Sequence, residues 1–392
     1  MLRGARRAIT SVLSTAAIAI VVAMVFDRLV AGARWVIAWP GDGDVWWSAV
    51  IVAGAVISMV ITQRARVDGR SVGVFVDDLV DPPADIRSAP ARLVASMTGV
   101  GLGTPLGLDG PALHLGGSLA AAAARVLRRR ERPWLIAGGV AALSMALDAP
   151  LAAALLVVEL APRRVPRRID VIPIAVGAGA GWLVRRLVAD DGGIMGPAPN
   201  LPAATVVPSG LVLGALCGVA GGVYSHALMR RGPVRRALAG RVAIVVVVLG
   251  AALPISWWAT GRPILAGAGD RAFEWAAGSS GLPVAVAAAA GAVVVATLIS
   301  ADVTGGLVLP VHWLGGMVGI VLAHTWLPSS SPSFAAVAGG CALLAAACAI
   351  PATALALGFA AFGWSAASAA VAVAVVVASA SSLTTRRPLV CS

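Results

Sequence analysis

The chain has 392 residues, of which 59% are hydrophobic and 12% are charged, and its mean hydropathy is +0.91. A soluble domain carries about 25% charged residues, so this composition excludes a water-soluble globular protein and predicts a polytopic membrane protein. The formal net charge of +12 would favour a nucleic-acid partner in a soluble protein. Here the positive side chains are all arginines gathered in short loops, which is typical of anchoring at membrane edges, and we expect no nucleic-acid partner.

Apolar runs follow one another along the chain, and several reach the ~20 residues needed to cross the hydrocarbon core. The first run lacks an Ala-x-Ala cleavage cue, so we interpret it as a retained helix rather than a signal peptide. Because lipid-exposed backbone has to satisfy its own hydrogen bonds, we expect the runs to be helical, with no soluble regulatory domain. The runs are 8–26, 46–62, 134–160, 169–188, 208–229, 240–258, 282–300, 306–326, 334–362 and 364–381.

The two halves of the chain share an order of prolines and glycines. Residues 111–117 are Pro-Ala-Leu-His-Leu-Gly-Gly, and residues 310–316 are Pro-Val-His-Trp-Leu-Gly-Gly. A second proline in an Ala/Leu-rich run follows each of them at similar spacing, at Pro150 and Pro351. We therefore predict two repeats with interrupted helices at matching positions, which is a transporter signature. The expected boundaries are about 8–189 for the first repeat, 190–208 for a linker, 209–384 for the second repeat and 385–392 for a short C-terminal segment.

The predicted interruptions lie at 101–111, at 148–150, at 301–310 and near Pro351. A helix N-terminus presents unpaired N–H groups and a partial positive charge of about half a unit. Two such ends meeting inside a membrane make an anion site without any buried Lys or Arg. Glycines before the two central helices, at 107, 110, 305 and 306, allow the backbone to approach an ion closely. The sequence therefore predicts a site for a small anion.

Asp109 is the one carboxylate in an apolar stretch, residues 101–118. It lies where the anion would lie, and it can compete with a diffusible anion for the same N–H groups. The alternative is an ordinary helix N-cap, since Asp followed by Gly-Pro is a common capping arrangement. The two interpretations are compatible, because a gate of this kind is a cap that can be released.

Other polar residues are interpreted more simply. His114 and His312 occupy similar places after the two prolines, and we expect them to be hydrogen-bonded within the helix packing rather than to bind a metal. Asp302 and the remaining isolated acids are interpreted as capping or loop residues. The four cysteines lack metal-ligand spacing, and no nucleophile or paired-acid arrangement supports an enzyme. We therefore expect no cofactor, no metal and no catalytic site.

The chain resembles the CLC family of chloride channels and chloride/proton antiporters. Residues 107–111, Gly-Leu-Asp-Gly-Pro, are similar to the family's Gly-Arg/Lys-Glu-Gly-Pro motif, and residues 306–310, Gly-Leu-Val-Leu-Pro, resemble its Gly-x-Phe-x-Pro motif. Residues 148–152, Asp-Ala-Pro-Leu-Ala, resemble its Asn-Ala-Pro-Leu-Ala run. The similarity covers nearly the whole chain in order and spacing.

The resemblance implies an all-α membrane protein of two inverted repeats with tilted and broken helices. It implies a homodimer with one pore per subunit, in contact with membrane lipid in the bacterial inner membrane. Chloride or another halide would be the substrate, and Asp109 would be the gate. The anion-binding residues would be Gly107, Gly110, Pro111, Ala112, Gly306, Leu307, Val308 and Leu309.

Departures from the family pattern limit what the resemblance implies. Leu160 stands at the position of the antiporters' intracellular proton-transfer glutamate, and the neighbouring Glu159 faces elsewhere because one helical residue is about 100° of rotation. Gly69-Arg70-Ser71-Val72-Gly73 is the nearest fit to the family's Gly-Ser-Gly-Ile-Pro signature. That fit would place Arg70 beside the ion, the alternative being a solvated loop charge. Val390 corresponds to the family's pore tyrosine.

These departures favour passive or loosely proton-coupled conduction of chloride. Two alternatives stay open at this point. The first is a fluoride/proton antiporter of the same fold, because the fluoride branch of the family also lacks the internal glutamate. The second is a transport-inactive membrane scaffold, which the missing family contacts at Arg70 and Val390 motivate.

Overall fold

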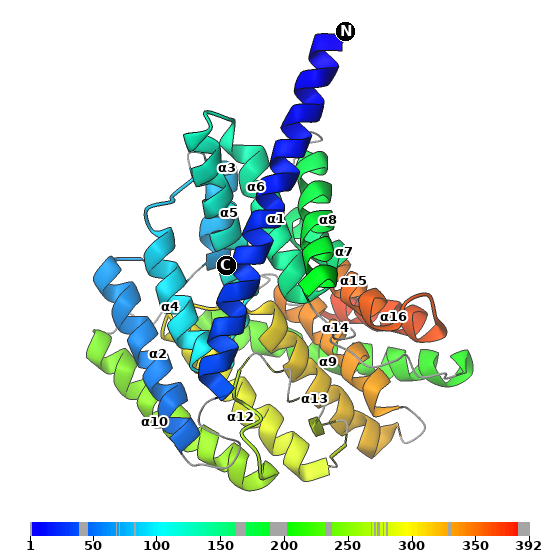
Figure 1. The fold of residues 1–392 in the computed structure, drawn as a ribbon. Coiled ribbons are helices and arrows are strands. Elements are labelled where there is room, and N and C mark those ends of the chain that lie inside the picture. Colours follow the sequence, from blue (N-terminus) through cyan, green and yellow to red (C-terminus); the bar gives the residue numbers. More distant parts are fainter. Residues whose placement is uncertain are drawn as a thin grey trace.

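The computed structural model describes most of the chain as helix. The described residues are 2–38, 46–67, 69, 71–81, 84–161, 170–188, 202–231, 237–267, 269, 272, 275–276, 278–279, 281–327 and 331–382. The helices are α1 (Leu2–Ala38), α2 (Trp46–Ala65), α3 (Ser71–Val80), α4 (Ala89–Gly101), α5 (Asp109–Val126), α6 (Glu131–Leu147), α7 (Pro150–Leu160), α8 (Val171–Val188), α9 (Ala203–Arg231), α10 (Leu238–Thr260), α12 (Gly281–Ser300), α13 (Val308–Trp326), α14 (Pro332–Cys348), α15 (Pro351–Phe362) and α16 (Ala366–Ser382). They form one bundle from which the start of α1 projects (Figure 1).

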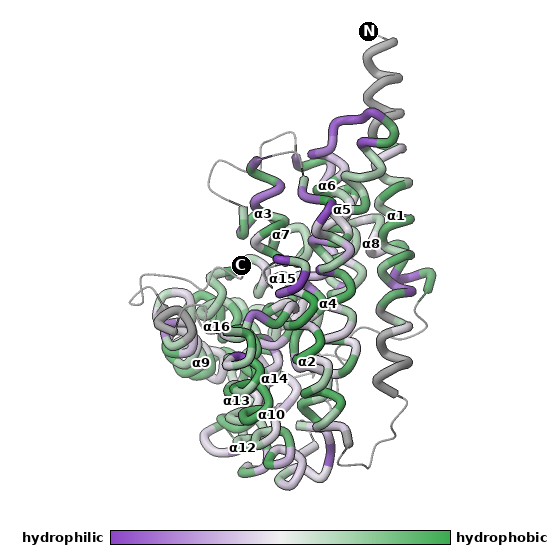
Figure 2. The backbone as a smooth tube through the Cα atoms, turned by 90° about the vertical axis from the view of Figure 1, so that its left-hand side faces the viewer, coloured by the Kyte–Doolittle hydropathy of each residue, from purple (hydrophilic) through white to green (hydrophobic). Residues whose placement is uncertain are grey.

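Seven of the described helices are long and apolar enough to cross a membrane, namely α1, α2, α8, α9, α10, α12 and α13. Four apolar helices, α7, α14, α15 and α16, are shorter. Figure 2 shows hydrophobic residues along most of the bundle, with many of the hydrophilic ones near α3, α5 and α6. The all-helical, multi-pass prediction is confirmed, since the β-type pairing in the described part is one isolated bridge.

The loops before α5 and α13 repeat the same backbone conformation at a separation of 199 residues. The N–H of Thr104 donates to the carbonyl five residues earlier at 3.1 Å, and the N–H of Val303 does the same at 3.0 Å. The preceding residues, Gly103 and Asp302, both lie in the left-handed region, with φ of 93° and 65°. The two loops are therefore structural equivalents, and the same register matches Asp109 with Val308, which are also 199 residues apart.

The second pair of interruptions is duplicated as well. The residues that follow α6 and α14, Asp148 and Ala349, are C-caps in the left-handed region, with φ of 47° and 54°. α7 and α15 then begin at Pro150 and Pro351, where proline suits the first turn because its missing N–H is not needed. The predicted breaks at 148–150 and near Pro351 are confirmed.

Close approach of small residues holds each half together. α5 packs on α6 and α13 packs on α14, and these are the two most extensive helix pairs in the described part. A Cβ atom on Gly116 would overlap the carbonyl of Gly138, and one on Gly315 would crowd the carbonyl of Gly339. Small residues let helix backbones approach closely in lipid, so each repeat has the same rigid helix pair behind its central loop.

Two helices were missed by the apolar pattern, and one boundary differs. α3 and α4 are short, and they lie in or beside the polar stretch 63–91, so no membrane-length apolar run marks them. α9 begins at Ala203, inside the segment expected to be the linker, and carries Pro208 within it. Hydropathy detects helices that face lipid along their length, whereas short helices covered by other helices give a weaker signal.

Candidate functional site

The loops that precede α5 and α13 meet in the middle of the molecule. The N–H of Gly107 donates to the carbonyl of Gly306 at 2.8 Å, and the N–H of Gly306 donates to the carbonyl of Gly107 at 2.7 Å. This reciprocal pair is the isolated antiparallel bridge. It fixes the N-terminus of one repeat's central helix beside that of the other, although the two helices are far apart in sequence.

The Asp109 carboxylate lies at the N-terminus of α13 and is fully buried. Its Oδ2 accepts a hydrogen bond from the N–H of Val308 at 3.1 Å. Oδ1 is buried and has no hydrogen-bond partner among the described residues. A buried carboxylate is costly unless donors and dipoles surround it, and a helix N-terminus supplies both.

Two glycines make room for this carboxylate. A Cβ atom on Gly107 or on Gly306 would overlap the Asp109 side chain. Any larger residue at either position would displace the carboxylate from the N-terminus of α13. The motif glycines therefore serve the close approach of an anionic group to the backbone, as the sequence predicts, and in this conformation the anionic group is the protein's own.

The N-terminus of α5 offers fewer free donors than the sequence motif indicates. Pro111 has no N–H group, and the N–H of Ala112 donates to the carbonyl of Leu108 at 2.8 Å. Gly110 is the next residue after Asp109, and a Cβ atom built there would lie 3.3 Å from the Cα of Gly306. The hydrogen-bond donor that the structure places on the Asp109 carboxylate comes instead from Val308, at the start of α13.

A third helix, α3, also begins at this site. A Cβ atom on Gly110 would lie 3.3 Å from Cγ2 of Val72 in the first turn of α3. Ser71, the first residue of α3, is buried, and its Oγ has no hydrogen-bond partner among the described residues. The sequence reasoning singled out Arg70 and missed Ser71, although a hydroxyl residue between glycines was the available signal. Arg70 and Val390 lie outside the described residues.

The Glu159 carboxylate accepts hydrogen bonds from the first residues of α15. Its Oε1 accepts from the N–H of Ala352 at 2.7 Å, and its Oε2 accepts from the N–H of Thr353 at 2.8 Å and from the Thr353 hydroxyl at 2.6 Å. Glu159 on α7 therefore caps the N-terminus of α15 in the other repeat. Leu160, next to it, packs against the hydrophobic core.

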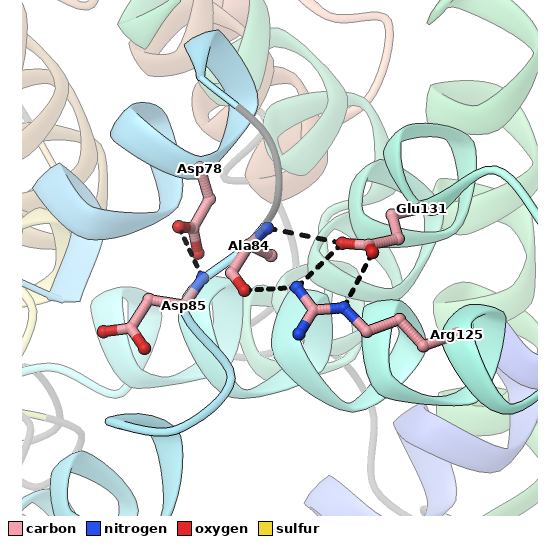
Figure 3. Close-up of polar contacts among 5 residues, drawn as sticks. All are labelled: Asp78, Ala84, Asp85, Arg125 and Glu131. Carbon is pink, nitrogen blue, oxygen red and sulfur yellow. Dashed lines mark hydrogen bonds and ion pairs between the residues drawn. The ribbon is translucent and has the colours of Figure 1, made fainter.

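Arg125, in the last turn of α5, belongs to a polar network with Glu131, the first residue of α6 (Figure 3). Arg125 forms an ion pair with Glu131 at 2.7 Å and donates to the carbonyl of Ala84 at 2.5 Å. The N–H of Asp85 donates to Oδ1 of Asp78 at 2.8 Å. The Arg125 guanidinium holds the pKa of Glu131 below its ordinary value, whereas burial raises the pKa of Asp78. The network ties the segment after α3 to the corner between α5 and α6.

His114 and His312 are both buried, but they do not occupy equivalent positions in the two repeats. In the 199-residue register of the two loops, His114 matches Trp313 and His312 matches Leu113. Among the described residues no group of three or more His, Cys, Asp or Glu side chains could hold a metal ion.

Comparison with known proteins gives a consistent family and fold. The family model for the voltage gated chloride channel matches residues 53–383. The H(+)/Cl(−) exchange transporter ClcA of Klebsiella pneumoniae (strain 342) is 29% identical over 69% of this chain and 61% of its own length. ClcA of Citrobacter koseri is 30% identical over 37% of this chain and 32% of its own length. The matched segments thus span less than two thirds of these relatives.

Solved structures support the same fold. A slow cyanobacterial Cl−/H+ antiporter superposes with a TM-score of 0.77 at 18% identity, covering 95% of this chain and 94% of its own. A CLC-type fluoride/proton antiporter superposes with a TM-score of 0.74 at 16% identity, covering 97% of each chain. At these identities the likeness concerns the fold alone.

Proposed function

The chain belongs to the voltage-gated chloride channel (CLC) family, and from this premise we propose that it carries a small inorganic anion, chloride by default, across the membrane. The observation that carries this proposal is the hydrogen bond from Val308 N–H to the buried Asp109 carboxylate. A carboxylate and a halide ion need the same surroundings, namely N–H donors at a helix N-terminus and no competing water. Asp109 therefore occupies a place that suits a halide.

Asp109 acts in this proposal as a gate that competes with the anion. The carboxylate leaves the N-terminus of α13 when it rotates away or takes up a proton, and the N–H groups of residues 307–309 then face the anion. Ser71 lies at the start of α3 beside the same loops, and its unpartnered hydroxyl is a further donor to a passing ion. The site is made of backbone donors and one hydroxyl, without a buried cation among the described residues that line it.

Proton coupling is absent or loose in this proposal. An obligatory exchanger needs a second titratable group that relays protons from the inner side of the membrane. Leu160 cannot hold a proton, and both carboxylate oxygens of Glu159 accept hydrogen bonds from the start of α15. A Glu159 side chain held by three donors is poorly suited to moving protons.

The proposed assembly is a homodimer in a bacterial cytoplasmic membrane, with one pore per subunit. The first repeat would extend over about 8–189, and the second would begin with α9 at Ala203 and reach about 384. The loops before α5 and α13 of one chain meet at the Gly107–Gly306 pair, so each subunit would have its own complete site.

The test is halide efflux from liposomes that contain the purified protein, with chloride and fluoride compared and proton movement recorded in the same preparation. Chloride efflux without fixed-ratio proton uptake supports the proposal. A preference for fluoride would replace chloride by fluoride as the substrate, and tight proton exchange at a fixed ratio would overturn the passive mechanism. The absence of halide efflux under any gradient would support a scaffold role instead.

A further inference from the structure

The loop that carries Gly306 and Val308 makes a second contact across the repeats at its other end. Oδ1 of Asp302 accepts a hydrogen bond from the N–H of Gly69 at 2.8 Å, over 233 residues of sequence. Gly69 lies two residues before Ser71, the first residue of α3. The loop before α13 thus contacts the segment before α5 through Gly306, and it contacts the segment before α3 through Asp302.

The geometry of this contact is specific to the residues present. Asp302 has a left-handed backbone, with φ of 65°, a conformation that Asp and Asn adopt more readily than most residues. A Cβ atom on Gly69 would lie 2.8 Å from the carbonyl oxygen of Asp302 and 2.9 Å from its Oδ1. The two segments therefore approach each other as closely as a glycine allows.

Arg241, in the first turn of α10, forms an ion pair with Asp302. Its Nη1 lies 3.8 Å from Oδ2 of Asp302 and donates to the carbonyl of Ala301 at 3.2 Å. Its Nη2 donates to Oε1 of Gln63, near the end of α2, at 2.6 Å. The Arg241 side chain is 14% exposed and that of Asp302 is 32% exposed. Arg241 thus balances the negative charge of Asp302 at a place that water reaches.

The equivalent contact in the first repeat uses no charge. Gly103 is the counterpart of Asp302, and its backbone carbonyl accepts from the N–H of Gly267 at 2.9 Å. The two loops therefore make matching contacts to the opposite repeat. Only the contact to the segment before α3 uses a carboxylate with an arginine partner. Ser71 and Val72, at the start of α3, lie next to the Asp109 site.

We propose that Asp302 is a positioning residue that fixes the N-terminus of α3 against the α13 loop and so sets how tightly the site holds an anion. Arg241 keeps the Asp302 charge from repelling that anion. This inference rests on the proposed function, because it assigns these residues to the same anion site. Neither side chain touches the anion in this proposal, since Asp302 acts through the segment at Gly69 and Arg241 acts through Asp302.

The test compares Asp302→Ala, Asp302→Asn and wild type in purified full-length protein. Chloride and fluoride affinities are measured by titration calorimetry, and amide hydrogen exchange is followed over residues 71–75. Asp302→Ala removes an acceptor of a charge-assisted hydrogen bond, so we expect about tenfold weaker halide binding and faster exchange at the start of α3. Asp302→Asn keeps an oxygen acceptor toward Gly69, so most of the affinity should be recovered.

A second series of variants separates the positioning of α3 from the effect of the Asp302 charge. Arg241→Gln leaves the Asp302 carboxylate uncompensated and should weaken halide binding, and adding Asp302→Asn to it should restore much of that loss. Asp170→Asn is the matched control, because Asp170, the residue before α8, forms a buried ion pair with Arg132 at 2.7 Å. That control should lower the unfolding temperature without changing halide affinity.

The outcomes distinguish this inference from the proposed function. Wild-type affinity in Asp302→Ala, or a loss of stability alone that matches the Asp170→Asn control, would overturn the positioning role. If wild type itself bound neither halide, the proposed function would fail. The exchange measurement would then still decide the positioning role, because unchanged exchange over residues 71–75 in Asp302→Ala would overturn it independently of any anion.

Discussion

Asp109, the first residue of α5, accepts a hydrogen bond at 3.1 Å from the N–H of Val308, the first residue of α13, and the two residues are repeat equivalents 199 positions apart. Each repeat thus contributes one half of a single contact. The first repeat supplies the charged side chain, and the second supplies the helix N-terminus that receives it. The two loops are equivalent, but the site between them is asymmetric. The proposed gate requires this asymmetry, because a single carboxylate has to compete with the anion.

Gly306→Ala should weaken halide binding by about tenfold or more, because the added Cβ would fill the space in which the Asp109 carboxylate, or a halide in its place, approaches the start of α13. Halide titration of the purified variant measures this loss. Gly179→Ala is the matched control, since a Cβ atom on that α8 residue would meet nothing within 4 Å. The control should bind halide as wild type does. Equal affinities in both variants would contradict the close-approach role of Gly306.

Glu159→Ala should destabilise the protein by about 1–3 kcal/mol, since it leaves the N-terminus of α15 without its acceptors. Chemical or thermal unfolding in detergent micelles measures the change. We expect any proton movement that accompanies halide flux to be the same in the variant as in wild type. A change in proton coupling without a change in stability would show instead that Glu159 carries protons.

Glu131→Gln should lower the unfolding temperature near neutral pH. The Arg125 guanidinium holds the pKa of Glu131 below its ordinary value of 4.5, so the ionised pair stabilises the fold above about pH 4.5. That contribution is lost as the pH falls through the lowered pKa, and wild type and variant should then converge. Arg128→Gln, on the exposed part of the same corner, is the control and should show no such convergence. A difference between wild type and Glu131→Gln that stayed constant with pH would contradict this account.

The sequence predicted the repeat register well, because prolines and glycines at helix interruptions leave a readable pattern. Pro150 and Pro351 mark real helix starts, and the loops before α5 and α13 coincide residue by residue. Composition was equally informative about the membrane class, since lipid-facing helices have to be apolar.

Contacts between distant segments could not be predicted in the same way. Local sequence indicates that Asp302 lies in a loop, but it does not indicate that its partner is Gly69. The same limit applies to Glu159, whose role as a cap depends on α15 from the other repeat. Ser71 was missed for a different reason. A gapless match of residues 69–73 to the family motif places Arg70, the neighbouring residue, at the position of the motif's serine.

The most direct test of the central claim is the rate of chloride efflux from liposomes that contain wild type or Asp109→Ala, measured over a range of pH. If Asp109 is a gate, removal of its carboxylate frees the N–H groups at the start of α13. The variant should then conduct several-fold faster, or lose the pH dependence that wild type shows. Identical rates and identical pH profiles in the two proteins would mean that Asp109 is a helix cap alone, and the gating account would be wrong.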